Sequence, residues 1–413
     1  MTQARPESTW HVAANGRFDE AMMDEKEAFM TTSGSTVSNQ DALSVIELFP
    51  QDEDWSIQTM RLLAQVSVGG ADLFECSRTA ARIGSVTTDT EIWYREWHKT
   101  ASDVAAQGDE AWAHGDRTTA RRAFFRSCSY YRHSEFFLAS DDPRRTQAYT
   151  LGRNNFRRAA QLTDGLIEQL EVPFEGQTME GYIVRPDASG ARRPTVLFLG
   201  GADSWAEELY FLGGSEFPAR GMNVVMIDTP GRGSSLRFKQ MYSRPDYEVP
   251  VRAVLDHLQQ RDDVDSDRLG LAGVSFGGYY APRAAAFEPR VKAVAAWCGT
   301  WSILTDFYEF YPALQEQLQW LSGSKDDAEA RRKLAAFTLE GVADQIAVPV
   351  YVMHGTRDII MDVAGAHRFI EALTTDDVTV DIYEGAGSLH CSYDYLAVAA
   401  ARLTDWFAHR LID

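Results

Sequence analysis

The 413-residue sequence is poor in cysteine and in positive charge, and it has no long uninterrupted hydrophobic run. Four cysteines, without a C-x-x-C pair or a close Cys/His set, indicate neither a disulfide framework nor a metal site. Forty Lys and Arg against sixty Asp and Glu leave a net charge of −20, which argues against a nucleic-acid partner. No apolar run approaches the roughly 18 residues that span a bilayer, and the first thirty residues show no leader pattern. We therefore expect a cytoplasmic protein without a membrane segment.

The composition that remains is that of an ordinary globular chain, with 45% hydrophobic and 24% charged residues. Residues 1–50 lack a clear period and predict an irregular arm, with one short helix around Phe18–Phe29 at most. Residues 51–170 are helical in texture, with few Gly or Pro and apolar residues at three-to-four spacing. Within them, the aromatic stretch Thr118–Ala139 predicts one long helix.

After about residue 170 short apolar runs alternate with helical patterns, which is the rhythm of a mostly parallel sheet flanked by helices. Residues 171–299 and 346–413 carry this rhythm, and residues 300–345 predict a helical insertion between them. The expected strands are Met179–Val184, Thr195–Gly200, Asn223–Asp228, Leu269–Val274, Val291–Trp297, Val348–His354 and Val378–Tyr383.

A nucleophile motif, Gly273-Val274-Ser275-Phe276-Gly277, directly follows one of these strands and precedes a helical run. In a G-x-S-x-G elbow, small flanking residues permit a sharp turn that projects the serine hydroxyl from the end of the sheet. A chance motif in a Gly-rich loop is the alternative, but the strand before it and the helix after it favour the elbow. Ser275 is the candidate nucleophile.

A serine nucleophile needs a base within hydrogen-bond reach and an acid that orients the base. Asp358 follows a predicted buried strand, where catalytic groups of parallel sheets belong, and is the candidate acid. His390, in the loop before the last helical run, is the candidate base. His354 is a weaker alternative base, because it ends the strand beneath the loop of Asp358.

The same reaction needs backbone N–H groups that stabilise an oxyanion. The N–H of Phe276 is one candidate donor, and the loop that begins with Gly200 supplies the other, with Ala202 favoured over Gly201. Ser204 and Glu207 form a capping-box pattern that predicts a helix start in this loop. The later loop 228–233 (Asp-Thr-Pro-Gly-Arg-Gly) fits turn chemistry better than a catalytic role.

With these residues in place, the chain resembles the alpha/beta-hydrolase family of dihydroxypseudooxynicotine hydrolase, the fungal polyketide-shortening pigment hydrolases and the fermentation-respiration switch proteins. The likeness spans about residues 110–413 and rests on the aromatic helix, the two glycine loops and the elbow. It implies a hydrolase core with a helical cap built from the N-terminal segment and the insertion, and a homodimer. It also implies that Ser275, Asp358 and His390 act without a cofactor.

The expected activity is hydrolysis of a carbon–carbon bond or an ester in an aromatic or polyketide-like acyl compound. A carboxylesterase or lactonase, an acyltransferase, and a catalytically silent ligand-binding or regulatory protein are the alternatives on the same fold. An apolar pocket is expected beneath the cap. Its candidate substrate contacts, each with core packing or a solvated surface as the alternative, are Tyr131, His133, Trp205, Trp301, Asp306 and Glu309.

Overall fold

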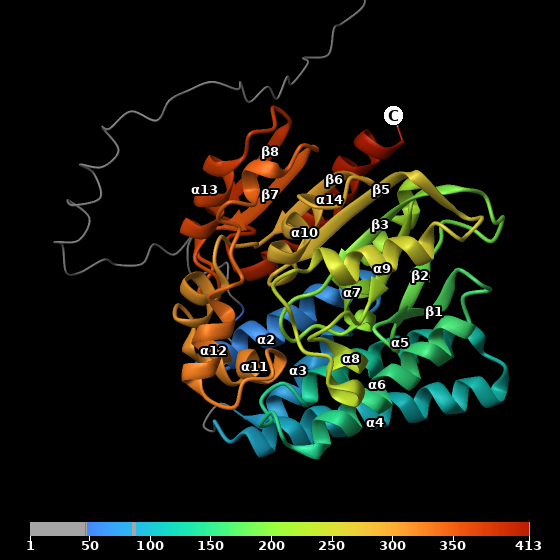
Figure 1. Cartoon of the computed structure of the whole chain (residues 1–413). Coiled ribbons are helices and arrows are strands. Elements are labelled where there is room, and N and C mark those ends of the chain that lie inside the picture. The colour runs from blue at the N-terminus through green and yellow to red at the C-terminus, as the bar shows by residue number, and fades with distance from the viewer. Residues whose placement is uncertain (1–45, 47, 85–87, 413) are drawn as a thin grey trace, which may run out of the picture. The chain divides into compact units, whose positions relative to one another are not determined.

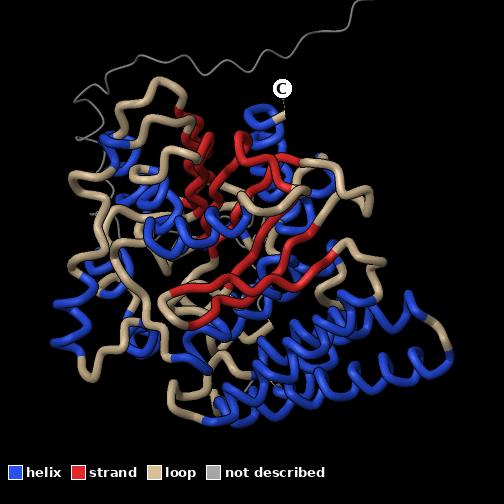
Figure 2. Tube along the Cα trace, turned by 45° about the vertical axis from the view of Figure 1, so that its right-hand side comes forward, coloured by secondary structure: helices blue, strands red, loops and turns tan. Residues whose placement is uncertain are grey.

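The computed structural model describes residues 46, 48–84 and 88–412, so the helix expected around Phe18–Phe29 lies outside the described residues. The described part is built on an eight-stranded sheet with strand order β1-β2-β4-β3-β5-β6-β7-β8 (Figures 1 and 2). β1, β2 and β4 pair antiparallel, and the strands from β4 through β3 to β8 are parallel. The strands are β1 (Ile167–Phe174), β2 (Gln177–Val184), β3 (Arg193–Leu199), β4 (Asn223–Ile227), β5 (Val264–Val274), β6 (Val291–Trp297), β7 (Val350–Gly355) and β8 (Val378–Tyr383).

The seven predicted strands are present as β2–β8, and the predicted α/β architecture is confirmed. Their apolar runs are buried on both faces, as parallel strands require. In β3, Val196 and Phe198 pack into one core while Leu197 and Leu199 pack into the other. The sequence pattern did not reveal β1, which lies at the sheet edge and alternates buried apolar residues with exposed polar ones. Its first residues fall inside the segment predicted as helical.

Among the described residues, five α-helices precede the sheet and form an N-terminal helical region, and the first four of them share a core of their own. Trp55, Trp93, Trp97 and Tyr130 are fully buried there and pack ring against ring. These helices are α2 (Glu53–Leu63), α3 (Leu73–Ile83), α4 (Thr90–His114), α5 (Arg117–Ser134) and α6 (Pro143–Gln161).

The aromatic helix predicted over Thr118–Ala139 is α5, which ends at Ser134. The chain leaves the helix there because Glu135 turns inward. Its carboxylate accepts hydrogen bonds from Arg145 at 3.0 Å, from Arg237 and from the Trp205 indole at 3.2 Å. A buried carboxylate needs such partners, and these contacts tie the end of α5 to α6, to α8 and to Trp205.

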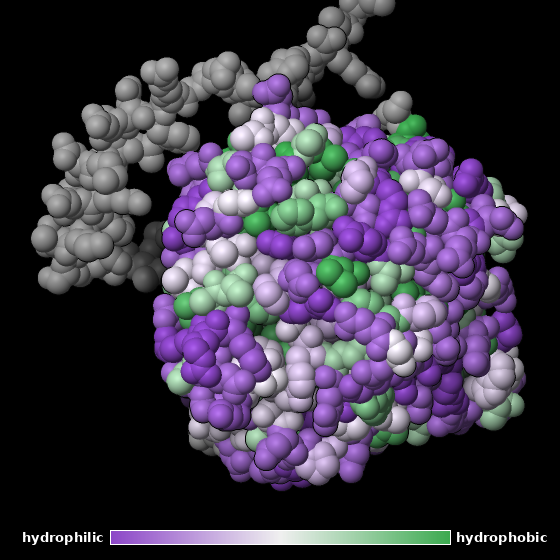
Figure 3. All heavy atoms as spheres, viewed as in Figure 1, coloured by the Kyte–Doolittle hydropathy of each residue, from purple (hydrophilic) through white to green (hydrophobic). Residues whose placement is uncertain are grey.

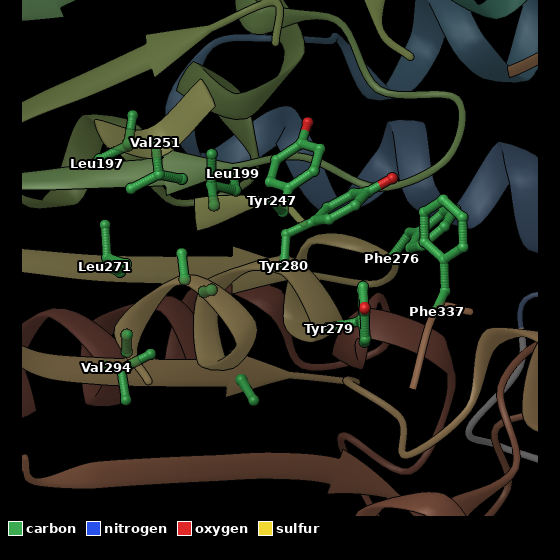
Figure 4. Close-up of a cluster of buried hydrophobic side chains, with 14 of the residues drawn as sticks. Leu197, Leu199, Tyr247, Val251, Leu271, Phe276, Tyr279, Tyr280, Val294 and Phe337 are labelled. Carbon is green, nitrogen blue, oxygen red and sulfur yellow. The ribbon is translucent and has the colours of Figure 1, made fainter. Parts of the chain in front are cut away.

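The remaining helices cover both faces of the sheet. Residues of α9, α10 and α13 pack with one face, and residues of α7 and α14 pack with the other. Figure 4 shows the first of these cores, in which Tyr247, Tyr280 and Phe276 lie beside the strand residues. These helices are α7 (Ala206–Phe211), α8 (Gly233–Lys239), α9 (Glu248–Leu258), α10 (Gly277–Ala285), α13 (Val363–Ala372) and α14 (Leu396–Leu411).

The segment between β6 and β7 is helical, as the sequence pattern predicts for residues 300–345. It begins with a short π-helix, Leu304–Tyr308, and continues with α11 (Gln315–Leu321) and α12 (Asp327–Leu334). The face of the molecule seen in Figure 3 is largely hydrophilic, with apolar residues in small scattered groups. Across the described residues, no helix combines the length and the apolarity that a membrane crossing needs.

One buried carboxylate, that of Asp228, joins three helices to the sheet. It accepts hydrogen bonds from the Tyr149 hydroxyl at 2.6 Å, from the Ala206 N–H at 2.8 Å and from the Ser234 N–H at 2.8 Å. A Cβ on Gly233 would lie 2.0 Å from this carboxylate, so only glycine fits beside it. The turn chemistry predicted for this loop therefore also fixes the starts of α7 and α8.

Replacing Asp228 by Ala should lower the free energy of unfolding by about 3 kcal/mol or more, because three buried donors lose a charged acceptor. Chemical denaturation followed by circular dichroism measures the change. The matched control is Asp262→Ala, which removes the carboxylate of an exposed residue and should stay within about 0.5 kcal/mol of wild type. Equal losses in the two variants would show that the Asp228 contacts do not hold the helices.

Candidate active site

Ser275 lies at the sharp turn between β5 and α10, in left-handed backbone conformation with φ of 58°. Its N–H donates to the Trp297 carbonyl at 2.8 Å, which ties the turn to the end of β6. A Cβ on Gly273 would lie 1.8 Å from the Gly277 carbonyl oxygen, and one on Gly277 would lie 2.2 Å from that of Leu199. The turn is possible only because both flanking positions are glycine.

His390 and Asp358 reach Ser275 from two other loops, which follow β8 and β7 at the carboxyl ends of the strands. His390 Nε2 is 3.0 Å from Ser275 Oγ, and His390 Nδ1 is 2.7 Å from Asp358 Oδ2. The second oxygen of Asp358 accepts the N–H groups of Ile360 and Met361, each at 2.9 Å. An ionised carboxylate only accepts, so the neutral form of His390 carries its proton on Nδ1 and offers the Nε2 lone pair to the serine hydroxyl.

His354, the alternative base, is buried behind the acid and does not face Ser275. Its Nδ1 accepts the Gly355 N–H at 3.0 Å, and its Nε2 is 3.9 Å from Asp358 Oδ2. Burial lowers the pKa of His354, with the Asp358 charge opposing the change. The structure thus brings His390, rather than His354, to the serine.

Burial and charge act in opposite directions on His390. Burial by itself would lower the pKa of His390, but the Asp358 carboxylate and, after it, the Cys391 sulfur raise this pKa well above its ordinary value. The same contact with His390 outweighs the burial of Asp358 and holds the pKa of that carboxyl below its ordinary value. Asp358 is therefore ionised, and it makes the imidazole a stronger base.

The loop after β3 packs directly against the nucleophile. A Cβ on Gly201 would lie 2.9 Å from Ser275 Cβ and 3.1 Å from Ser275 Oγ. The Gly201 N–H donates to Ser204 Oγ at 2.9 Å, so this donor is already engaged. Ala202 is next in the chain, and it remains the better candidate for the second oxyanion donor beside Phe276.

The capping-box pattern at Ser204 and Glu207 serves another purpose than the sequence suggests. α7 does begin in this loop, but its N-cap is Trp205, which makes no side-chain capping bond. Ser204 Oγ instead accepts the Gly201 N–H. Glu207 is buried, and its carboxylate accepts a hydrogen bond from the Tyr182 hydroxyl at 2.7 Å. Burial, and next the nearby Asp228 charge, raise the pKa of Glu207 to about 7.

Two buried arginines of the N-terminal helical region fasten this loop. Arg61 of α2 is 2.7 Å from Asp203 and 2.7 Å from Glu208. Arg132 of α5 pairs with Asp203 as well and lies 3.1 Å from Glu208. Despite its burial, the two cations lower the pKa of Asp203. This loop, residues 200–205, holds the candidate oxyanion donor and is called the oxyanion loop below. Charges on two helices that are distant in the sequence thereby hold it in place.

A pocket opens beside Ser275 and His390, and much of its wall comes from residues that the sequence did not single out. They belong to α2, to the turn after α5, to the insertion and to the loops after β7 and β8. Its other lining residues are Gln58, Arg61, Phe136, Asp203, Ser204, Leu212, Val274, Phe307, Leu314, Ile360, Cys391 and Tyr393. The sequence shows that Asp203 and Glu208 would require cationic partners if they were buried. No sequence pattern, however, identifies Arg61 among the arginines as that partner.

The six predicted substrate contacts do not meet at Ser275. None of them is among the described residues that line this pocket. The Tyr131 hydroxyl is 3.0 Å from Ser102 Oγ, between α4 and α5. The His133 ring packs between Trp93 and Trp97, with centroids 4.9 and 4.7 Å away. These two side chains therefore belong to the core of the helical region, which was the alternative interpretation.

Two predicted tryptophan contacts also serve packing. Trp205 is fully buried, donates its indole N–H to Glu135 and packs edge-on against Tyr149. Trp301 is half-buried against the core beneath the insertion, and its backbone carbonyl accepts the Leu339 N–H at 2.9 Å. Neither tryptophan is among the described residues that line the pocket at Ser275.

The two predicted acidic contacts differ from each other in burial. Asp306 is only 2% exposed, which corrects the expectation of a solvated acid. It accepts the Thr300 hydroxyl at 2.6 Å and pairs with Arg368 of α13. Glu309 is exposed and pairs with Arg331 of α12. Asp306 thus fastens the start of the insertion to α13, and Glu309 is an ordinary surface ion pair.

Two protein-family models match the chain. The model described as "Esterase FrsA-like" matches residues 77–314, and the model described as "Dienelactone hydrolase family" matches residues 237–407. The two matches overlap across the elbow and together reach from α3 to α14.

Similar curated proteins are fungal hydrolases. The alpha/beta hydrolase psoB of Aspergillus fumigatus is 32% identical over 374 residues, which is 79% of this chain and 82% of that protein. Hydrolase LUC6 of a Fusarium species is 39% identical and covers 60% of this chain. The 20-hydroxy-prefusarin hydrolase FUS2 of Gibberella moniliformis is 37% identical and covers 58%. The chain spans only 61% of LUC6 and 59% of FUS2.

Among solved structures, that of 2,6-dihydroxy-pseudo-oxynicotine hydrolase superposes with a TM-score of 0.75 at 24% identity. The match covers 85% of this chain and 96% of that one. At this identity the likeness establishes the fold, including the placement of helices ahead of the sheet, and no more than the fold.

Substituting Gly201 by Ala should lower kcat/KM by roughly 10- to 100-fold, because the new methyl group would displace Ser275 or the oxyanion loop. Initial rates with any turned-over ester, together with the thermal midpoint, measure the effect. Gly385→Ala is the control, since a Cβ there meets no atom within 4 Å. A Gly201→Ala enzyme as active as this control would show that the loop is not packed against the nucleophile in solution.

Proposed function

The chain belongs to the FrsA-like esterase family of alpha/beta hydrolases, and from this premise we propose that it is a serine hydrolase that works without a cofactor. Ser275 is the nucleophile, His390 the base and Asp358 the residue that orients the base. The proposal is carried by one observation: a continuous pair of hydrogen bonds, 3.0 and 2.7 Å long, that links the three side chains.

In the first half of the reaction His390 Nε2 takes the proton of Ser275 as Oγ attacks a carbonyl carbon. The resulting oxyanion accepts the N–H groups of Phe276 and Ala202. When the tetrahedral intermediate collapses, the bond to the leaving group breaks and the imidazolium of His390 gives it the proton. An ester then releases an alcohol. A β-diketone releases an enolate carbon, which the same proton converts to a ketone.

In the second half His390 deprotonates a water molecule, which attacks the acyl-enzyme and releases the acid. Asp358 stays ionised throughout and stabilises the imidazolium, so it needs no proton of its own. One histidine suffices for both halves because it alternates between base and acid.

We propose as substrate an aromatic or polyketide-like acyl compound in which a carbon–carbon bond or an ester is cleaved. The relative named for 20-hydroxy-prefusarin supports a small-molecule substrate of secondary metabolism. A second pocket shares Phe136, Asp203 and Leu314 with the pocket at Ser275, so the two pockets adjoin each other. We further propose that α2–α6 together with α11 and α12 form the helical cap over these pockets.

A plain carboxylesterase or lactonase is the second candidate, favoured by the family descriptions that name esterases and dienelactone hydrolases. An acyltransferase would use the same acyl-enzyme with an alcohol in place of water. A silent binding protein would have no use for a buried, aligned Ser-His-Asp set, which argues against it. The homodimer and the cytoplasmic location stay predictions.

Ser275→Ala should abolish turnover, since no other group replaces the nucleophile. Mass-spectrometric product analysis of wild type and variant, given matched aryl β-diketones and aryl esters, tests the role and the bond together. Serine-dependent cleavage of the diketone would establish carbon–carbon hydrolysis, and cleavage of the esters alone would establish the esterase. Equal turnover by the variant would contradict the assignment of Ser275.

The activity should rise with pH, because only neutral His390 accepts the serine proton. Since His390 has a raised pKa in the folded protein, activity is present above that pKa and is lost as the pH falls through it. The groups that face this imidazole are the Asp358 carboxylate, the Cys391 thiol and the His354 ring. The profile of log kcat/KM against pH should therefore fall on the acid side at a pH above the ordinary histidine value.

Asp358→Asn should move this acid limb to lower pH and lower the plateau by about 10⁴-fold. It removes the charge, and because the Ile360 and Met361 N–H groups hold the amide oxygen, an NH2 donor faces His390 Nδ1 and favours the wrong tautomer. The control is Asp376→Asn, at an exposed position between α13 and β8, and it should leave the pH profile of kcat/KM unchanged. An acid limb that stays in place in Asp358→Asn would mean that Asp358 does not set the pKa of the base.

A further inference from the structure

Arg232 is a buried cation at the foot of the oxyanion loop. It follows β4 in the loop 228–233 and is only 2% exposed. Its Nε donates to the Gly200 carbonyl at 2.8 Å, and its Nη1 donates to the Pro230 carbonyl at 3.2 Å. Gly200 directly precedes Gly201, which packs against Ser275, and Ala202, the favoured candidate for the second oxyanion donor. Arg232 therefore holds the loop from its first peptide.

The same guanidinium packs against the aromatic side chains beneath the nucleophile elbow. Its carbon lies 4.4 Å from the centre of the Tyr280 ring and 5.5 Å from that of Phe276. Tyr280 stacks on Phe276 at 4.6 Å and on Tyr247 at 3.5 Å, and Figure 4 shows these three rings side by side. Phe276 supplies the other candidate oxyanion donor, so Arg232 touches both walls of the oxyanion hole.

Among the described residues, two carbonyl oxygens and, at 3.4 Å, the Tyr247 hydroxyl accept the hydrogen bonds of Arg232, and no carboxylate does. Asp228 is the nearby acid, and its oxygens are already used by Tyr149, Ala206 and Ser234. Arginine tolerates such an environment because its guanidinium stays charged and stacks on aromatic rings. A positive charge is thus kept close to the oxyanion hole without a directly bonded counter-ion to cancel it.

We propose that Arg232 is a positioning residue of the oxyanion hole, which sets the Gly200–Ala202 backbone against Ser275 and favours negative charge there. The inference rests on the proposed function. The charge acts in a buried site, where electrostatic effects are stronger than in water, and its target exists only once the oxyanion forms. Arg232 should therefore contribute to kcat more than to KM.

The test compares Arg232→Met and Arg232→Lys with Arg237→Met. Arg237 is a matched control, because it is a buried arginine of α8 that also stacks on aromatic rings but pairs with Glu135. Four quantities are measured for each protein: kcat, KM, the affinity for an aryl trifluoromethyl ketone that forms an oxyanion adduct with serine, and the thermal midpoint.

Arg232→Met should lower kcat by about 100-fold with KM nearly unchanged, and the ketone affinity should fall by a similar factor. Arg232→Lys should recover part of both losses, because it restores the charge but not the forked hydrogen bonds. Arg237→Met should lower the thermal midpoint while kcat and the ketone affinity stay at the wild-type values.

Wild-type ketone affinity in Arg232→Met would overturn the proposal, and so would equal losses of kcat in Arg232→Met and Arg237→Met. If Arg232→Met does not fold, a fully active Arg232→Lys with wild-type ketone affinity would overturn it as well. Ser275→Ala separates this role from the proposed function. A ketone that binds Ser275→Ala as tightly as wild type would contradict the serine mechanism itself.

Discussion

The site depends on how closely backbone can approach backbone at the carboxyl end of the sheet. Three chain segments meet there with no side chain between them: the turn at Gly273, the start of α10 at Gly277 and the loop at Gly201. Because these positions carry no Cβ, Ser275 can take a left-handed conformation and still lie against the oxyanion loop. The strained turn is maintained by the surrounding sheet, which has no freedom to relax it.

Such close packing of loops needs anchors, and the anchors are buried charges. Arg61 and Arg132 bind Asp203 and Glu208 above the loop, and Arg232 binds its first carbonyl from below. Buried ion pairs add little net stability, because desolvation costs about as much as the attraction gains. What the ion pairs provide here is a fixed position for the loop. If the loop moved, a buried charge would lose its partner, and this would be energetically unfavourable.

Much of this arrangement was readable from the sequence. The alternation of short apolar runs with helical patterns predicted the sheet, because this signal is local. The elbow motif and the chain order Ser, Asp, His selected Ser275, Asp358 and His390, which lie within hydrogen-bond distance in the structure. β1 was missed because its alternation is short and lies at an edge. The substrate contacts were misplaced because aromatic residues such as His133 and Trp205 have the same sequence signature in a core as in a pocket. Which arginine meets Asp203 depends on packing between distant helices, and no local pattern encodes it.

The machinery below the pocket does not distinguish an ester from a carbon–carbon bond. In the mechanism that we propose, both need the same attack by Ser275, the same oxyanion and the same proton from His390, and they differ only in whether an oxygen or a carbon leaves. The difference must therefore lie in how the substrate is held, since the leaving carbon has to be close to the His390 proton when the bond breaks. The groups able to hold it, among them Gln58, Phe136 and Leu314, come from the N-terminal helices and the insertion. In this proposal the loops at the end of the sheet carry the reacting groups, and the surrounding helices determine which bond of the substrate is cleaved.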